Sequence, residues 1–358
     1  MSLYFIKKIM MYCLCLLLIS VKEQTNAQKN NSEPHGWWHG DRPLLHNEVR
    51  DKKLLPLISV KRNHFVDPSG NVILFKGVSI GDPDKIDHEG HWDKSLFDHI
   101  KDFGAMLVRI PVHPVAWRER MPEHYLSLLD SAVSWCTAEG IYVDIDWHSI
   151  GNLETELFQD SMYNTTLKET YEFWRVIARH FSGNNTVAFF ELFNEPTSYR
   201  GQLGNISWSD WKKINENIIR LIRSYDTSAI PLVAGFDWAY DLTPLREEPI
   251  DAENIGYVTH PYPFKRTQPW EPKWEEDFGF AAKNYPVIAT EIGYVARPGD
   301  PDDGAEHYGS RITQYLQDNG ISWVAWVYDP EWGPQLLKSW NFDLTRCGEF
   351  FKESIHAK

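Results

Sequence analysis

The sequence predicts an α/β chain folded as a single (β/α)8 TIM barrel, because strand-like and helix-like segments alternate along it. Eight apolar strand-like segments begin near these positions: Val72, Met106, Ile141, Val187, Ile230, Ile255, Val287 and Ile321. Uninterrupted apolar runs are typical of parallel strands that are covered on both faces. Eight such alternations over about 290 residues fit this barrel.

The segments between these strands carry helix signals. We expect helices at residues 94–103, 123–139, 167–181, 209–225 and 305–318. The fourth has Ser207 or Ser209 as a plausible N-cap, and the fifth ends at Asn319-Gly320, a C-cap signal. Residues 242–253 make a poor helix, so the fifth barrel helix should be short. A doubly wound open sheet is the alternative, but no glycine-rich phosphate loop follows an early strand.

The chain divides into three segments. Residues 1–27 read as a signal peptide, 28–55 as an arm or linker, and 56–358 as the barrel domain. Within that domain, residues 57–65 and 71–76 flank the turn sequence Asp67-Pro68-Ser69-Gly70. We therefore expect a small β-hairpin that closes one end of the barrel.

The first 27 residues predict export. Lys7 and Lys8 precede an apolar run at residues 9–19 that is too short to span a bilayer, and Ala27 ends a tolerable cleavage site. A secreted protein, extracellular or periplasmic, follows, with an uncleaved membrane anchor as the alternative. The mature chain keeps Cys136 and Cys347, which we expect to be unpaired because two cysteines do not make a disulfide framework.

The charge of the chain limits its partners. Its formal net charge of −14 argues against nucleic acid and, once the signal is removed, against anionic membranes. Aromatic residues make up 14% of the chain, including 16 Trp, and flat rings match the apolar faces of pyranose sugars. We expect a monomer that acts on a polysaccharide.

Two glutamates end apolar strands. Glu195 lies in Phe193-Asn194-Glu195-Pro196, and Pro196 forces the chain to turn; Glu291 ends a second strand as Thr290-Glu291-Ile292. Catalytic residues of parallel barrels lie at the C-terminal ends of strands. Two carboxyl groups placed in this way are what glycoside hydrolysis requires.

Other polar side chains interrupt the same strands. Arg109 stands in an apolar strand, where it either anchors the barrel interior by ion pairing or keeps a nearby carboxylate ionised. Strand periodicity puts Asp144, Asp146 and His148 on one face. We interpret the two aspartates as a paired polar layer with Arg109, and His148 as a substrate contact.

The sixth and eighth strands supply aromatic and imidazole groups. His260 and Tyr262 share one face at the end of the sixth strand, and Trp326 on the eighth suits a stacking floor for a sugar. No ligand cluster with metal-binding spacing occurs, and 300–304 lacks the full calcium-loop pattern, so we predict neither metal nor cofactor.

These motifs resemble glycoside hydrolase family 5, the cellulase-like family of the retaining (β/α)8 clan, over roughly residues 57–340. The resemblance implies that Glu195 is the general acid/base and Glu291 the nucleophile. It further implies supporting or substrate-binding roles for six residues: Arg109, His148, Asn194, His260, Tyr262 and Trp326. The first strand segment, residues 75–83, reads Phe-Lys-Gly-Val-Ser-Ile-Gly-Asp-Pro where many members carry a Gly-Val-Asn segment, which leaves the subfamily and therefore the substrate open.

The predicted function is a retaining endo-β-glycosidase of the cellulase or endoglucanase kind, acting on β-1,4-linked polysaccharide. β-Mannan, xyloglucan and mixed-linkage glucan are alternative substrates, because mannose differs at the 2-hydroxyl that Asn194 is expected to contact. A non-catalytic carbohydrate-binding barrel is the alternative from another class, disfavoured by the presence of both glutamates.

Overall fold

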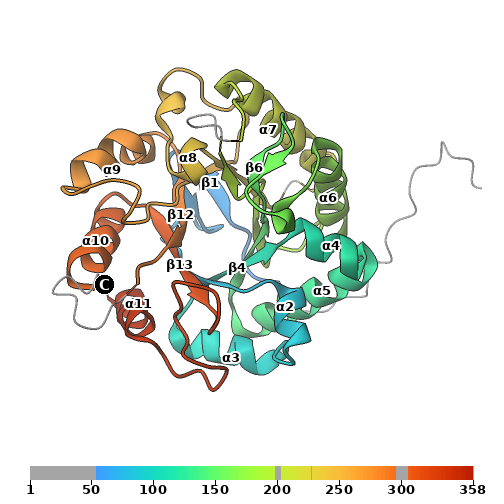
Figure 1. Cartoon of the computed structure of the whole chain (residues 1–358), viewed down its shortest axis with the longest axis vertical. Coiled ribbons are helices and arrows are strands. Elements are labelled where there is room, and N and C mark those ends of the chain that lie inside the picture. The colour runs from blue at the N-terminus through green and yellow to red at the C-terminus, as the bar shows by residue number, and fades with distance from the viewer. Residues whose placement is uncertain (1–53, 198–202, 227, 296–304, 358) are drawn as a thin grey trace, which may run out of the picture. The chain divides into compact units, whose positions relative to one another are not determined.

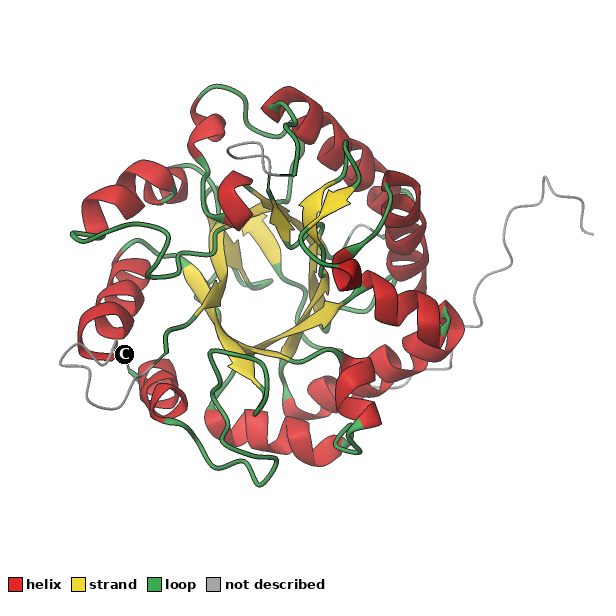
Figure 2. Cartoon of the chain, in the orientation of Figure 1, coloured by secondary structure: helices red, strands yellow, loops and turns green. Residues whose placement is uncertain are grey.

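The computed structural model describes residues 54–197, 203–226, 228–295 and 305–357. Within them, eight parallel strands close into a barrel with helices outside, as Figures 1 and 2 show. The barrel strands are β3 (Lys76–Ile80), β4 (Leu107–Val112), β5 (Tyr142–Trp147), β8 (Val187–Glu191), β10 (Ile230–Ala234), β11 (Gly256–Val258), β12 (Val287–Ile292) and β13 (Ser322–Tyr328).

The closed barrel confirms the predicted fold. Strand β13 pairs in parallel with β3, which closes the ring and excludes an open sheet. The first barrel strand, however, begins at Lys76 rather than near Val72. Val72 forms only an isolated antiparallel bridge with Val66 and is 59% exposed, because it belongs to the turn that precedes the barrel.

The predicted helices are present with small shifts at their ends. They are α3 (Lys94–Phe103), α5 (Pro122–Glu139), α6 (Leu167–His180), α7 (Trp208–Arg223) and α10 (Ser310–Asp318), the last preceded by a π-helical turn at Ala305–Gly309. Ser207, not Ser209, caps α7 by accepting from the backbone N–H of Asp210. The fifth barrel helix is short as expected, reduced to a 3-10 turn at Thr243–Arg246.

Several further elements did not emerge from the sequence patterns. They are α2 (Pro83–His88), α4 (Pro114–Arg120), α8 (Phe236–Ala239), α9 (Glu271–Asp277), α11 (Arg346–His356), and 3-10 turns at Ser161–Tyr163 and Gly279–Lys283. Most are too short for a helical period to stand out. The longest, α11, begins after Thr345, whose side chain accepts from the backbone N–H of Gly348.

A hairpin covers the N-terminal end of the barrel, as expected. It pairs β1 (Ser59–Lys61) with β2 (His64–Val66), so its turn is at Arg62-Asn63 rather than at Asp67–Gly70. Phe65 from β2 packs edge-on against Phe189 of β8 with ring centroids 5.0 Å apart. In Figure 1 the blue strand labelled β1 lies within the ring of barrel strands.

The chain after β8 continues in a way that the sequence did not indicate. Glu195-Pro196 forms β9, which pairs in parallel with β6 (Ile150–Asn152) in a three-stranded sheet completed by β7 (Leu157–Phe158). The prediction that Pro196 turns the chain is therefore wrong. Because β9 is an edge strand, the missing N–H of Pro196 costs no ladder hydrogen bond.

Two further predictions concern the cysteines and the N-terminal segment. Cys136 and Cys347 are buried and unpaired, as expected. The signal segment and the Trp37-Trp38 arm lie outside the described residues. Among the helices that the structure describes, none has the length and apolar character needed to cross a membrane.

Candidate active site

Arg109 connects the buried acids beneath the C-terminal end of the barrel. Its side chain is inaccessible to solvent, and Nε and Nη2 each donate to one oxygen of Glu191 at 2.8 Å. Nη1 donates to Oε1 of Glu291 at 2.8 Å. Nη2 also lies 2.9 Å from Asp146 and donates to Oδ1 of Asn194 at 2.7 Å. A planar guanidinium can hold several acceptors at fixed angles in this way.

The predicted polar layer is only partly correct. Asp146 pairs with Arg109, whereas neither carboxyl oxygen of Asp144 meets a donor side chain. Burial and the charge of Glu191 raise the pKa of Asp144 well above its usual range. This shift favours the neutral form of Asp144 beside the Glu191 carboxylate. Glu191 was present in the motif but had no predicted role.

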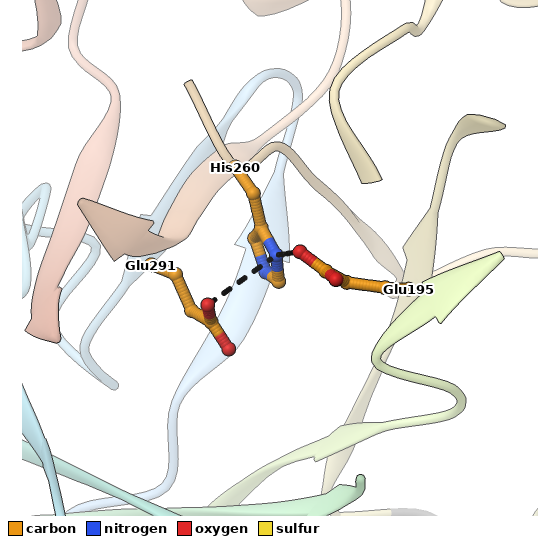
Figure 3. A group of neighbouring side chains, drawn as sticks. All are labelled: Glu195, His260 and Glu291. Atoms are coloured by element: carbon orange, nitrogen blue, oxygen red, sulfur yellow. Dashed lines mark hydrogen bonds and ion pairs between the residues drawn. The ribbon is translucent and has the colours of Figure 1, made fainter. Parts of the chain in front are cut away.

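His260 lies between the two glutamates, as Figure 3 shows. Its Nδ1 is 3.0 Å from Oε1 of Glu195 and 3.8 Å from Oε2 of Glu291, and its Nε2 is 2.9 Å from the Thr290 hydroxyl. Burial opposes a charged ring, but the surrounding carboxylates outweigh it and raise the pKa of His260 to about 9. The ring is therefore protonated at neutral pH.

Glu291 is held at both oxygens. Oε1 accepts from Arg109, and Oε2 accepts from the Tyr262 hydroxyl at 2.8 Å. Burial raises the pKa of Glu291 above its usual value, while His260, Arg109 and Tyr262 act in the opposite direction. The expected effect of Arg109 and Tyr262 is thus present, but desolvation exceeds it, since Glu291 is only 5% exposed.

His148 and Trp326 form one side of the site. Nδ1 of His148 lies 2.5 Å from Asp146, and burial together with His113 and Arg109 lowers the pKa of His148 well below its usual range. Its neutral ring is parallel to Trp326, with centroids 5.3 Å apart and planes within 2°.

A cavity of about 810 Å³ opens onto these side chains. Six of the eight predicted site residues line it, whereas Arg109 lies beneath them and His260 contacts both glutamates without lining the cavity itself. Nδ2 of Asn194 is buried without a partner, so it remains available to a ligand.

Six of the eight predicted side chains form part of the cavity surface, while His260 and Arg109 lie behind them. The surface residues among the predicted set are His148, Asn194, Glu195, Tyr262, Glu291 and Trp326. Sequence reasoning missed five aromatic or imidazole groups that line the same cavity: His113, Tyr163, Trp238, Phe264 and Trp332. For His113 a signal existed, because it follows β4 as His148 follows β5.

Within the described residues, Glu195, His260 and Glu291 are also the one group of three side chains whose ligand atoms all lie within 4.8 Å of one another. A metal ion at this place would have to displace the proton of His260, whose pKa is raised to about 9. The residues therefore fit proton transfer better than metal binding. That activity needs no metal or cofactor stays a prediction.

Two carboxyl groups at the C-terminal end of a (β/α)8 barrel, beside aromatic rings and a positioned arginine, define the class of barrel glycoside hydrolases. The comparison with known families agrees: the model of the cellulase family, glycosyl hydrolase family 5, matches residues 66–331. The chain belongs to glycosyl hydrolase family 5 and is a glycoside hydrolase.

Individual relatives extend this assignment. A solved β-glucanase of Saccharophagus degradans is 43% identical, with a TM-score of 0.84, and the match covers 90% of this chain and 98% of that one. Endoglucanase A of Butyrivibrio fibrisolvens is 24% identical over 86% of this chain and 68% of its own length. Endoglucanase E-5 of Thermobifida fusca is 25% identical over 76% of this chain, which spans 56% of that relative.

Proposed function

We propose that this protein is a secreted, retaining endo-β-glucanase that hydrolyses β-1,4-linked glucan with Glu291 as nucleophile and Glu195 as general acid/base. The observation that carries the proposal is the separation of the two acids. Ligand oxygens of Glu195 and Glu291 lie within 4.8 Å of each other. Retaining enzymes have carboxyl groups about 5–5.5 Å apart, whereas inverting enzymes need about 6.5–9.5 Å to admit a water molecule.

The contacts of each acid favour these roles. Oε1 and Oε2 of Glu291 accept from Arg109 and Tyr262, which stabilise the anion that must attack the anomeric carbon. Oε1 of Glu195 is occupied by the protonated His260 ring, so its Oε2 is the atom that can carry a proton to the leaving oxygen. The bond from Glu291 to the sugar forms as the glycosidic bond breaks.

The second step reverses the role of Glu195. Once the leaving group has departed with its proton, Glu195 is a carboxylate and can remove a proton from water as that water attacks the sugar. The glycosyl bond to Glu291 then breaks, and Glu195 is protonated again. Because both displacements invert the anomeric carbon, the product retains its configuration.

The substrate class is supported by the relatives and by the lining of the cavity. The β-glucanase of Saccharophagus degradans has also been solved in complex with cellotetraose. In this chain the unpartnered Nδ2 of Asn194 can donate to a sugar hydroxyl, and Trp326 lines the cavity with 8% of the residue exposed. Both features suit a pyranose chain, and β-1,4-glucan is the substrate that we propose.

A panel of purified polysaccharides tests the proposal. Release of reducing sugar should be fastest from β-1,4-glucan or mixed-linkage glucan, and proton NMR should detect the β-anomer first. Faster release of reducing sugar from mannan would show that mannan, and not β-1,4-glucan, is the substrate. Initial appearance of the α-anomer would contradict the retaining mechanism. Binding of polysaccharide without release of reducing sugar would favour a non-catalytic carbohydrate-binding barrel. Export is tested separately: N-terminal sequencing of secreted material should begin near Gln28.

A further inference from the structure

We propose that His113, oriented by Asp82, binds a hydroxyl group of the sugar that becomes attached to Glu291, and thereby helps to select the substrate. This inference rests on the proposed function. It concerns two residues to which neither the family motifs nor the relatives assign a role here.

His113 stands beside His148 because their strands are neighbours in register. Val112 of β4 pairs with Trp147 of β5, and each histidine is the next residue along its strand. The backbone N–H of His148 donates to the carbonyl of Val112 at 2.9 Å. The two imidazole rings lie with centroids 4.5 Å apart, and both line the cavity.

Asp82 fixes the orientation of the His113 ring. Its Oδ2 accepts from the backbone N–H of His113 at 2.8 Å and lies 3.0 Å from Nδ1 of that ring. Its Oδ1 accepts from the Tyr125 hydroxyl at 2.9 Å and from the backbone N–H of Asp84 at 2.8 Å. With four donors on a carboxylate that is 3% exposed, Asp82 is held rigidly.

The same arrangement occurs at His148, where Asp146 lies 2.5 Å from Nδ1. Each aspartate binds the Nδ1 side of its histidine, so each ring has its Nε2 side left for the cavity. His113 is only 2% exposed, and a polar ring atom at such a site gains from a partner that replaces water. Two Asp–His pairs therefore present two neighbouring hydrogen-bonding groups to one ligand.

The position of His113 in the cavity indicates which sugar it contacts. Glu195 follows β8, whose neighbour β10 leads to Trp238, and Glu291 lies on β12, whose neighbour β13 carries Trp326. A leaving group must lie on the side of the acid, and the sugar that bonds to Glu291 on the other side. His113 is connected to this second side through Trp332, whose ring centroid lies 5.1 Å from that of His113 and 6.4 Å from that of Trp326.

The ligand hydroxyls can be identified with aryl β-cellobiosides, whose sugar units must occupy that side because the aryl group is the leaving group. A series lacking one hydroxyl at a time should reveal one position whose loss lowers kcat/KM of the wild-type enzyme about tenfold, the effect of one hydrogen bond of about 1.4 kcal/mol. In His113→Asn, kcat/KM for the parent substrate should fall about tenfold. In that variant, removal of the same hydroxyl from the substrate should cause no further loss of kcat/KM.

The choice of variants separates binding from folding. Asn can keep the contact with Asp82 but has no group in the place of Nε2, whereas Gln in His113→Gln can place an amide there and should restore part of the activity. His180→Asn is the matched control, because Nε2 of His180 lies 2.7 Å from Asp130 in a pair that does not line the cavity. Its kcat/KM should equal that of the wild type.

Three results would overturn the proposal. The first is an unchanged kcat/KM in His113→Asn. The second is that every deoxy substrate lowers kcat/KM by the same factor in His113→Asn as in the wild type. The third is that both His113 variants lose activity only to the extent that their Tm is lowered. A wild-type enzyme that cleaves no β-glucoside would instead contradict the proposed function. In that case the His113 assignment fails with it, whereas additive losses in an active enzyme refute His113 alone.

Discussion

Replacing Glu191 by glutamine should lower the free energy of unfolding by about 3 kcal/mol at pH 7. Glu191 is inaccessible to solvent, and both of its oxygens accept from Arg109. Burial favours its neutral form, but the charge of Arg109 and the contacts with His260 outweigh this and lower its pKa from 4.5 to about 2. A difference of this size corresponds to about 3 kcal/mol of stabilisation of the ionised form.

The effect should depend on pH in a defined direction. Because the pKa of Glu191 is lower in the folded than in the unfolded chain, its contribution is fully present above about 4.5 and is lost as pH falls through about 2. The difference between wild type and Glu191→Gln should therefore shrink to roughly half by pH 3. Breaking a buried ion pair typically costs about 3–5 kcal/mol, which is consistent with the larger value at neutral pH.

Denaturant titrations of both proteins at pH 7 and pH 3, followed by tryptophan fluorescence, would measure the effect. Glu172→Gln is the control, since Glu172 is 56% exposed in its side chain and lies 3.7 Å from Lys168 on the outer face of α6. This control should match the wild type at both pH values. An equal penalty for Glu191→Gln at pH 7 and pH 3 would refute the electrostatic reasoning and indicate a purely steric effect.

Three further predictions concern catalysis. Glu291→Ala and Glu195→Ala should each reduce turnover by at least about 100-fold. Added azide should restore activity in Glu291→Ala with an inverted glycosyl azide as product, and in Glu195→Ala with a retained glycosyl azide. The opposite pairing of products, detected by NMR, would exchange the roles of the two residues. Tyr262→Phe removes a hydrogen bond that lowers the pKa of Glu291, so the acid limb of kcat/KM should move to higher pH, and a shift to lower pH would contradict this. Treatment with a chelator should leave activity unchanged, and its loss in a folded sample would reveal a metal site.

The sequence was sufficient to predict the barrel and the two acids for a physical reason. Each barrel strand is an apolar run, so a charged residue at its end is conspicuous, and parallel strands bring all such ends to one edge. Glu195 and Glu291 are 96 positions apart, yet both contact His260. Their meeting follows from strand order alone, without knowledge of side-chain conformation.

What the sequence could not provide is the pairing of groups within that edge. The assignment of Asp144 to Arg109 failed because period two gives the face of a strand, whereas the rotation of the guanidinium toward Asp146 and Glu191 depends on neighbouring packing. Asp82 and His113 come from different strand ends, and their contact depends on a helix beginning at Pro83 that is only six residues long. Such local geometry leaves no periodic signal.

The buried charges explain how one arginine can serve both stability and catalysis. Arg109 donates two hydrogen bonds to Glu191 and one to Glu291, and the pKa of Glu191 is lowered to about 2 while that of Glu291 is raised. Glu191 therefore remains a permanent anion that fixes the guanidinium. Glu291 also accepts from Arg109, but for Glu291 the effect of burial on the pKa is larger than the effect of this cation. The carboxylate of Glu291 is therefore less stabilised than that of Glu191 and stays available for attack on a sugar. Replacing Glu191 should consequently lower the pKa of Glu291 as well as the stability of the barrel, because the charge of Arg109 would then be shared between Glu291 and Asp146 without Glu191.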